Sequence, residues 1–223
     1  MLFVLSGASG SGKTTLCAAL AARADLVVRD VDEAANADPA PTSLDRRWRA
    51  EATETRIREA LEQQRAGVDF VLAGGVFGEL LACPSATELD GIAGCLLDCE
   101  EAERVRRLRV RDPGRDDGSE ELWPHVIWSA WLRLHRVDPQ WLPRVLREPD
   151  PHGGRVAPWL EWERWAGWGA ADARWSFERL STSDEDVEAT CAQLLEWIEG
   201  RRAARKAGTL PLAGRWWDPP TSG

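Results

Sequence analysis

The sequence predicts an α/β fold in which a parallel β-sheet carries helices on both faces. Short apolar runs alternate with longer segments of helical composition along the chain, which is the order that builds such a sheet. The first apolar run leads through a glycine-rich loop directly into a helix, as α/β proteins often do. With 223 residues, 43% of them apolar, the chain has the size of one large domain with a substantial core.

The elements of the first half follow from composition and from the residues that end each run. Residues 2–6 are apolar and are stopped by glycine, which predicts a buried strand, and residues 13–23 are rich in alanine and leucine, which favours a helix. A second strand is expected at residues 26–29, before an acidic stretch. Prolines then interrupt the chain before a charged helix at residues 44–64.

The second half continues the alternation. Strands are expected at residues 68–73, 92–97 and 174–180, and helices at residues 100–111, 122–136 and 184–199. Residues 112–119 are polar and turn-rich, as in a mobile lid connection. The expected organisation is a domain over residues 1–200, with a lid region at about 100–136, a tryptophan-rich insertion at about 138–173 and a C-terminal tail at 201–223.

Charge and cysteine usage bear on the class of partner and on the compartment. A formal net charge of −9 disfavours a broad surface for duplex nucleic acid or anionic lipid, without excluding nucleic acid, and favours small substrates. Five scattered cysteines, an odd number, indicate a reducing and therefore cytoplasmic location. The opening apolar run is too short for a signal peptide and no later stretch reaches membrane-spanning length, so we expect neither secretion nor insertion.

The most specific motif is the loop after the first strand. It reads Gly7-Ala8-Ser9-Gly10-Ser11-Gly12-Lys13-Thr14. Its glycines permit backbone angles that aim N–H groups inward, at the start of a helix whose dipole favours phosphate. Lys13 is expected to reach the β and γ phosphates, and the hydroxyl of Thr14 to ligate Mg²⁺. The sequence therefore predicts a site for a nucleoside triphosphate.

Extended by Thr15, this loop resembles the loops of the nucleoside and nucleotide kinase-like group, which includes shikimate, gluconate, adenylate and antibiotic-modifying kinases. The resemblance covers roughly residues 1–200 and is most specific in the loop. It implies a P-loop NTPase fold with a five-stranded parallel sheet and a helical lid that carries arginines. It also implies transfer of the γ-phosphoryl group from ATP to a small acceptor.

Two aspartates stand at the end of the second expected strand. Kinases of the resembling group often place there a carboxylate that orients or deprotonates the acceptor hydroxyl, so Asp30 and Asp32 are candidate substrate-binding residues. Asp32 is the candidate catalytic base. If the strand continues, residues one apart point opposite ways, and only one aspartate would face the nucleotide. Which one does so is open, and Asp30 is also a candidate Mg²⁺ ligand.

The third expected strand ends without the acid of a Walker B motif, because Gly74 and Gly75 follow it. Mg²⁺ would then depend on Thr14, phosphate oxygens, water and one of the two aspartates. Gly75, with its neighbour, would let backbone approach a substrate. Glu79 and Ser85 follow on the expected acceptor side, where they either contact substrate or cap and pack a short helix.

Polar residues after the fourth and fifth strands are candidates for the donor side. Arg104, Arg107 and Arg111 share one helix face and resemble lid arginines. Arg107 and Arg111 would stabilise phosphate charge in the transition state, and Arg107 would also bind ATP. The alternative is a solvated face paired with nearby glutamates. Thr182 and Ser183 are expected to lie against adenine; alternatively, or in addition, Ser183 caps the last helix.

The tryptophans are concentrated in the second half of the chain. Trp159, Trp162, Trp165 and Trp168 recur every three residues, a spacing that wraps around a helix and favours packing over a base-stacking surface. No combination of histidine, cysteine and carboxylate has the spacing of a zinc site.

These observations predict an ATP- and Mg²⁺-dependent kinase of a small molecule such as a nucleoside, sugar, antibiotic or other metabolite. A polynucleotide 5′-hydroxyl kinase shares the loop, and a nucleotide-dependent switch acting on a protein partner is a third hypothesis. The guanine-selective sequence Asn-Lys-x-Asp is absent, which disfavours GTP. The acceptor stays open, as does the choice between monomer and homodimer.

Overall fold

The computed structural model describes residues 1–36, 45–111, 122–149, 155–183 and 186–218. Its centre is a five-stranded sheet in the order β2-β3-β1-β4-β5, with every neighbouring pair parallel. The strands are β1 (Leu2–Ser6), β2 (Leu26–Asp30), β3 (Asp69–Ala73), β4 (Ile92–Asp98) and β5 (Phe177–Ser181). The predicted α/β class and five-stranded parallel sheet are confirmed.

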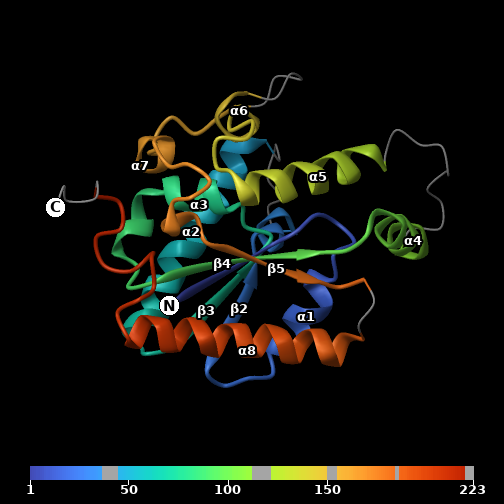
Figure 1. The fold of residues 1–223 in the computed structure, drawn as a ribbon, viewed down its shortest axis with the longest axis horizontal. Helices are drawn as coiled ribbons and strands as arrows, with labels where there is room; N and C mark the ends of the chain where they lie inside the picture. Colours follow the sequence, from blue (N-terminus) through green and yellow to red (C-terminus); the bar gives the residue numbers. More distant parts are fainter. Residues whose placement is uncertain (37–44, 112–121, 150–154, 184–185, 219–223) are drawn as a thin grey trace.

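Helices cover both faces of the sheet (Figure 1). They are α1 (Lys13–Leu20), α2 (Arg46–Arg65), α3 (Phe77–Ala82), α4 (Glu101–Arg111), α5 (Trp123–Val137), α6 (Arg144–Arg147), α7 (Glu163–Ala166) and α8 (Val187–Lys206). Three 3₁₀ helices complete the described part: η1 (Val31–Asn36), η2 (Pro84–Glu88) and η3 (Ala173–Trp175). Among the described residues, no helix combines the length and apolar character needed to cross a membrane.

The core has two parts because neighbouring strand residues point to opposite faces. In β1, Leu2 and Val4 join the cluster under α2, α3 and α5, whereas Phe3 and Leu5 join the cluster under α1 and α8. All four side chains are fully buried. This explains why the strand is an unbroken apolar run, as expected for a parallel sheet covered on both sides.

Three elements differ from the sequence prediction by three residues or more at a boundary. The first helix ends at Leu20 instead of residue 23. Residues 173–175 form η3 instead of strand, because Asp172 accepts a hydrogen bond from the backbone N–H of Arg174 and starts a turn there. The last helix begins at Val187, where Asp186 is the N-cap through the N–H of Ala189, and it continues to Lys206. Capping by Ser183 is therefore wrong, and the expected tail begins inside a helix. The expected lid connection, residues 112–119, lies outside the described residues.

The tryptophans of the second half pack inside the molecule. Trp165 is completely buried and Trp168 is 4% exposed. The indole N–H of Trp165 donates to the carbonyl of Gly78 at 2.8 Å, and a Cβ at Gly78 would lie 2.9 Å from the indole. Trp159 and Trp162 are partly buried against the same cluster. The packing interpretation of this repeat is confirmed, although only a four-residue helix, α7, lies within it.

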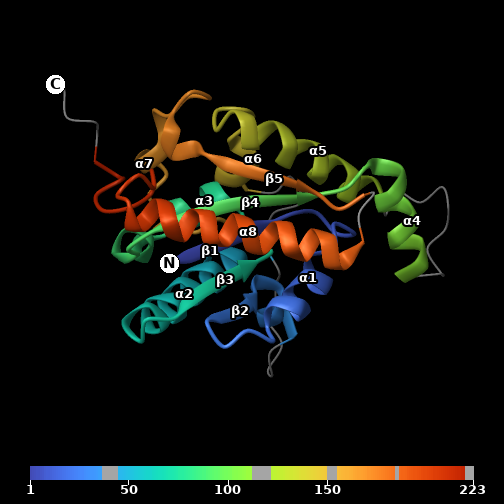
Figure 2. The same ribbon diagram turned by 60° about the horizontal axis from the view of Figure 1, so that its bottom comes forward.

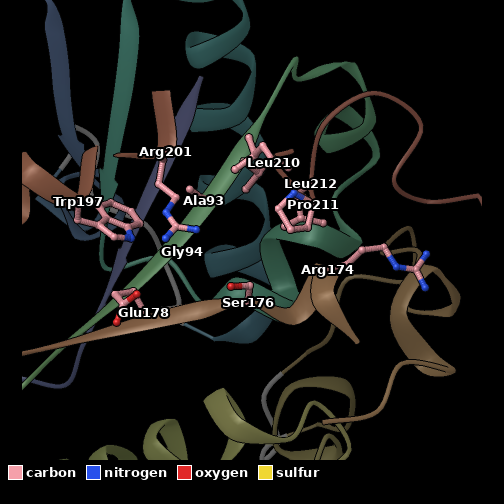
Figure 3. Close-up of a pocket in the computed structure, with 11 residues that line it drawn as sticks. Ala93, Gly94, Arg174, Ser176, Glu178, Trp197, Arg201, Leu210, Pro211 and Leu212 are labelled. Atoms are coloured by element: carbon pink, nitrogen blue, oxygen red, sulfur yellow. The ribbon is translucent and has the colours of Figure 1, made fainter. Parts of the chain in front are cut away.

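The C-terminal segment lies against the amino ends of the strands, far from the glycine-rich loop. The carbonyl of Leu212 accepts the N–H of Ile92 at 2.9 Å, and Arg174 donates to the carbonyl of Trp216 at 3.0 Å. Figure 3 shows Leu210 and Leu212 beside the start of β4, around a pocket of about 10 Å³. This volume accommodates about one water molecule, so the pocket is a packing defect rather than a ligand site.

Candidate active site

The glycine-rich loop lies between β1 and α1, at the carboxyl edge of the sheet. Gly12 has φ of 84°, a left-handed conformation that favours glycine, and α1 begins at the next residue. The first N–H groups of a helix have no partner within it, so those of α1 face outward over the loop. The ammonium of Lys13 turns back to the carbonyl of Gly7 at 2.7 Å and reaches that of Ala8 at 3.3 Å. The ammonium of Lys13 therefore lies within the loop, at the expected position of the phosphates.

Two adjoining cavities open over this loop. The larger measures about 330 Å³ and is lined by Ser9, Gly10, Ser11, Gly12, Lys13, Thr14, Thr15, Asp30, Asp32, Arg107, Leu108 and Arg111. The smaller measures about 210 Å³ and is lined by Gly12, Thr15, Leu16, Arg107, Thr182, Val187 and Thr190. They share Gly12, Thr15 and Arg107, so together they form one elongated cleft. Most of the predicted site residues come together here.

Both aspartates line the larger cavity, which corrects the expectation that only one would face it. The strand ends at Asp30 and η1 starts at Val31, so the alternation of a strand no longer applies. The carboxylate of Asp30 accepts the N–H of Asp32 at 3.0 Å, which folds the chain back. Desolvation and the negative charge of Asp30 raise the pKa of Asp32 above its ordinary value, against the opposing charge of Lys13. Desolvation lowers the pKa of Lys13, while both aspartates oppose this.

Gly74 explains why a Walker B acid is missing after β3. Its φ is 76°, and a Cβ there would lie 2.8 Å from Oδ1 of Asp30. A side chain at position 74 and the carboxylate of Asp30 would therefore occupy the same space. Gly75, by contrast, is buried, and a Cβ on it would lie 3.1 Å from Val4. Gly74 therefore leaves room for the carboxylate of Asp30, and Gly75 leaves room for the packing of Val4. Approach of either backbone to a substrate stays a prediction.

The three arginines of α4 have different surroundings. Arg107 lies where the cavities meet, and it donates to the carbonyl of Gly10 at 3.3 Å and to Oγ1 of Thr182 at 3.1 Å. It also pairs with Glu103 at 2.6 Å, so part of the solvated-pair alternative holds as well. Arg111 lines the larger cavity and is exposed.

Arg104 is not a lid arginine, because its side chain is 1% exposed behind the loop. It donates to the carbonyl of Ser9 at 2.8 Å and to Asp98 at 2.9 Å. Asp98 also pairs with Arg133 of α5 and Arg179 of β5. Burial opposes ionisation of Asp98, yet the arginines hold its pKa below the ordinary value. Through Arg104, this cluster fixes the outer side of the loop to four elements: β4, α4, α5 and β5.

Residues after β5 divide between the cavity and its support. Thr182 is 5% exposed, lines the smaller cavity and donates through Oγ1 to the carbonyl of Ser11 at 3.1 Å. Ser183 instead accepts the N–H of Glu100 at 2.7 Å through its hydroxyl oxygen. The structure therefore brings Thr182 to the cleft and uses Ser183 to hold the start of α4.

The expected acceptor side contains an arginine, Arg49, that no sequence motif marks. Arg49 makes a two-pronged ion pair with Glu79, at 2.7 and 3.0 Å, and its guanidinium lies 5.9 Å from the ring of Trp128. Desolvation opposes its charge, but Glu79 raises the pKa of Arg49 above its ordinary value. Asp32 contributes to the same shift, so Arg49 and Asp32 lie within electrostatic range.

The expected acceptor residues Glu79 and Ser85 are both buried. The carboxylate of Glu79 is 1% exposed beneath Arg49, and the hydroxyl of Ser85 donates to Glu54 at 2.6 Å. The sequence signal is a run of basic residues in the first turn of α2, which opposes the helix dipole but does not distinguish Arg49 from Arg46 or Arg47.

The candidate cation ligands are oxygen atoms. Thr14 is exposed in the cavity, and Asp30 and Asp32 contribute carboxylates to the same wall. Within the described ranges, no group of three or more His, Cys, Asp or Glu residues could hold a metal ion alone. Mg²⁺ accepts such a site, because it binds through one or two protein oxygens together with phosphate oxygens and water.

The sheet order, the loop and the start of α1 define a P-loop NTPase fold. Residues 4–123, more than half of the chain, match the family AAA_18, described as an AAA domain, and the chain belongs to this family. A comparison with curated protein sequences found no significant match.

Several solved structures share the fold at low sequence identity. The crystal structure of APE1195 is 15% identical with a TM-score of 0.50, and the match covers 90% of this chain and 95% of that chain. A sugar kinase from Janibacter sp. HTCC2649 is 14% identical with a TM-score of 0.48, covering 89% and 94%. Thymidylate kinase from Candida albicans is 12% identical with a TM-score of 0.46, covering 90% and 92%. At these identities the likeness concerns the fold alone.

Proposed function

We propose that the protein is an ATP- and Mg²⁺-dependent phosphotransferase that moves the γ-phosphoryl group to a hydroxyl of a small molecule. A nucleoside, a sugar, an antibiotic or another metabolite would serve as acceptor. One observation carries the proposal: Asp32, with a raised pKa, lines the same cavity as Lys13 and the start of α1. A carboxylate within reach of a phosphate site is the group that phosphoryl transfer to a hydroxyl requires.

The residues divide the reaction between them. The N–H groups of the loop and the ammonium of Lys13 hold the triphosphate, and the adenine ring lies in the smaller cavity beside Thr182. Thr14 and Asp30 would hold Mg²⁺, which when bound offsets charge on the phosphate oxygens. Asp32 orients the acceptor hydroxyl and takes its proton, and its raised pKa makes it a better proton acceptor than an ordinary carboxylate.

The arginines act on the phosphates and the acceptor. Arg107 and Arg111 reach the larger cavity from α4 and would stabilise the equatorial oxygens during transfer. Arg49 lies within electrostatic range of Asp32, and we assign it to the acceptor because its ion pair with the buried Glu79 fixes its position. Glu79 is thus a positioning residue beneath the acceptor rather than a direct contact.

The first test is transfer from γ-labelled ATP to pools of nucleosides, sugars, aminoglycosides and hydroxyl-ended oligonucleotides. Labelled product is expected from one small-molecule pool and only with Mg²⁺ present. Transfer to oligonucleotides alone would replace the proposal with a polynucleotide 5′-hydroxyl kinase. ATP hydrolysis or binding without transfer to any pool would instead favour a nucleotide-dependent switch.

The second test separates the role of Asp32 from that of the loop. Asp32→Asn should lower the transfer rate by roughly 10²- to 10⁴-fold while ATP affinity changes little. Lys13→Ala should lose both binding and transfer. Glu33→Gln is the matched control, because Glu33 follows in the same 3₁₀ helix but pairs with Arg56 at 3.1 Å. An active Asp32→Asn enzyme would remove Asp32 from the base role.

A further inference from the structure

An apolar surface, whose residues line neither cavity over the loop, covers the outer side of α5. Eight large apolar side chains are exposed in the described part of the chain, and six of them lie together on α5 and the turn after it: Trp123, Ile127, Leu134, Val137, Trp141 and Leu142. Their exposed fractions range from 42% to 64%. Contiguous exposed apolar area of this kind marks an interaction site.

The spacing of these residues indicates what kind of element they contact. Along α5 the apolar stripe consists of Trp123, Ile127, Ala130, Leu134 and Val137, at alternating intervals of four and three. This 3.5-residue repeat keeps one face in contact with a second helix over several turns.

The opposite side of α5 is already committed to the domain. Leu132 is 5% exposed in the core, Arg133 donates to Asp98 at 2.6 Å, and Arg136 donates to the carbonyl of Phe177 at 2.9 Å. These contacts hold the helix in one rotation, so the apolar stripe cannot turn inward. Figures 1 and 2 both show α5 at the outside of the molecule with β5 on its inner side.

We propose that the apolar stripe of α5 binds the same stripe of a second copy of this chain, with the two helices antiparallel. Consider an antiparallel pair whose two-fold axis passes midway between Ala130 and Leu134. Each residue of one helix then faces a residue of the other helix, and the two residue numbers have the same sum in every facing pair, or layer. Ala130 then meets Leu134 of the other copy, and Ile127 meets Val137. Both layers recur on the other side of the two-fold axis, as a symmetric dimer requires.

Self-pairing suits the sizes and charges of these residues. The smallest side chain, Ala130, faces Leu134 in both central layers, so the helices can approach closely. None of the five stripe residues is charged, so the contact places no like charges together. The six exposed apolar side chains amount to on the order of 600 Å² per copy, so a dimer that covered all of them would bury at most about 1,200 Å², the lower bound for specific interfaces. The dimer is therefore reversible and depends on concentration.

Sedimentation velocity over a range of protein concentrations tests the association. The wild-type protein should pass from monomer to dimer as concentration rises, at physiological salt so that the net charge of −9 is screened. Ile127→Glu and Leu134→Glu should each stay monomeric with an unchanged circular dichroism spectrum. Val110→Glu is the matched control, because Val110 is 69% exposed on α4, outside the stripe, and it should dimerise normally. A monomeric wild-type protein, or a dimer that survives Leu134→Glu, would overturn the proposal.

A charge-pairing experiment tests the antiparallel orientation. Ala130→Glu and Leu134→Lys should each abolish dimerisation alone. An equimolar mixture should form a heterodimer, because residue 130 of one copy faces residue 134 of the other while the second central layer remains native. In a parallel pair, residue 130 of one copy would face residue 130 of the other. The introduced Glu and Lys would then not face each other, so mixing the two variants would not restore the dimer. Absence of the heterodimer, with both variants folded, rejects the antiparallel arrangement.

Discussion

Asp30 and Gly74 share one small volume beside the phosphate loop. The carboxylate of Asp30 fills the space that a side chain at position 74 would need, and Gly74 also has a left-handed backbone. From the sequence, the glycine was recognisable as a departure from a Walker B motif. Its reason was not, because a clash between residues 44 positions apart in sequence depends on the pairing of β2 with β3, where Asp30 lies opposite Ala73.

Gly74→Ala should therefore impair the proposed transfer by displacing Asp30. We expect a loss of up to about 100-fold, the size that small misplacements in active sites produce. Gly67→Ala is the matched control: its φ is 75°, close to that of Gly74, but no atom lies within 4 Å of its Cβ position. Both variants carry similar backbone strain, so equal transfer rates in the two would show that the contact with Asp30 is irrelevant.

At the scale of elements, the strands and long helices were predictable because their signals are local. Apolar runs ended by glycine or acid define β1 to β4 within one or two residues, since a buried parallel strand has no polar face. The start of β5 was missed because a short 3₁₀ turn holds similar residues. Partners across elements were also missed. Burial of Arg104 against Asp98 and pairing of Arg49 with Glu79 join segments that only the folded sheet brings together.

The position of α5 depends on an aromatic cluster around His135. Its ring is 3% exposed, stacks on Trp131 at 4.3 Å and meets the edge of Trp175 at 5.2 Å. Burial lowers the pKa of His135 from 6.5 to about 4, although the carbonyl of Trp141 opposes the shift. The folded protein therefore keeps this ring neutral where the unfolded chain would protonate it.

This predicts a loss of stability in acid. Below about pH 6.5 His135 is protonated in the unfolded chain, whereas in the folded protein it stays neutral until about pH 4. The free energy of unfolding therefore falls as the pH drops through this window. The contribution of this group is about 3 kcal/mol across the window. His135→Phe keeps an aromatic ring but cannot titrate, so urea unfolding between pH 4 and pH 7 should show a shallower dependence. Equal slopes in the two proteins would contradict the assignment.

The whole molecule is closed by its C-terminal segment. Leu210 joins the apolar cluster under α1 and α8, while Leu212 and Trp216 join the cluster on the other face of the sheet. One short segment thus completes both halves of the core at the amino ends of the strands. The cleft lies at the opposite, carboxyl edge, so stability and nucleotide binding depend on different ends of the same sheet.

Truncation after Ala207 should separate these two properties. It keeps α8 but removes three buried apolar side chains, each worth about 1.5–3 kcal/mol, so the free energy of unfolding should fall by about 5 kcal/mol or more. That is comparable to the total stability of many domains. Urea unfolding followed by tryptophan fluorescence measures the loss.

Truncation after Asp218 is the control and should unfold like the full chain, because Leu210, Leu212 and Trp216 all remain. The fraction of the shorter protein that stays folded at low temperature should still bind ATP with nearly normal affinity, because its loop, Asp30 and Arg107 are intact. If the apparent ATP affinity of the truncated protein fell only as much as its folded fraction, the two edges of the sheet would act independently. A folded truncated protein that has lost ATP binding would show instead that the C-terminal segment shapes the cleft through the strands.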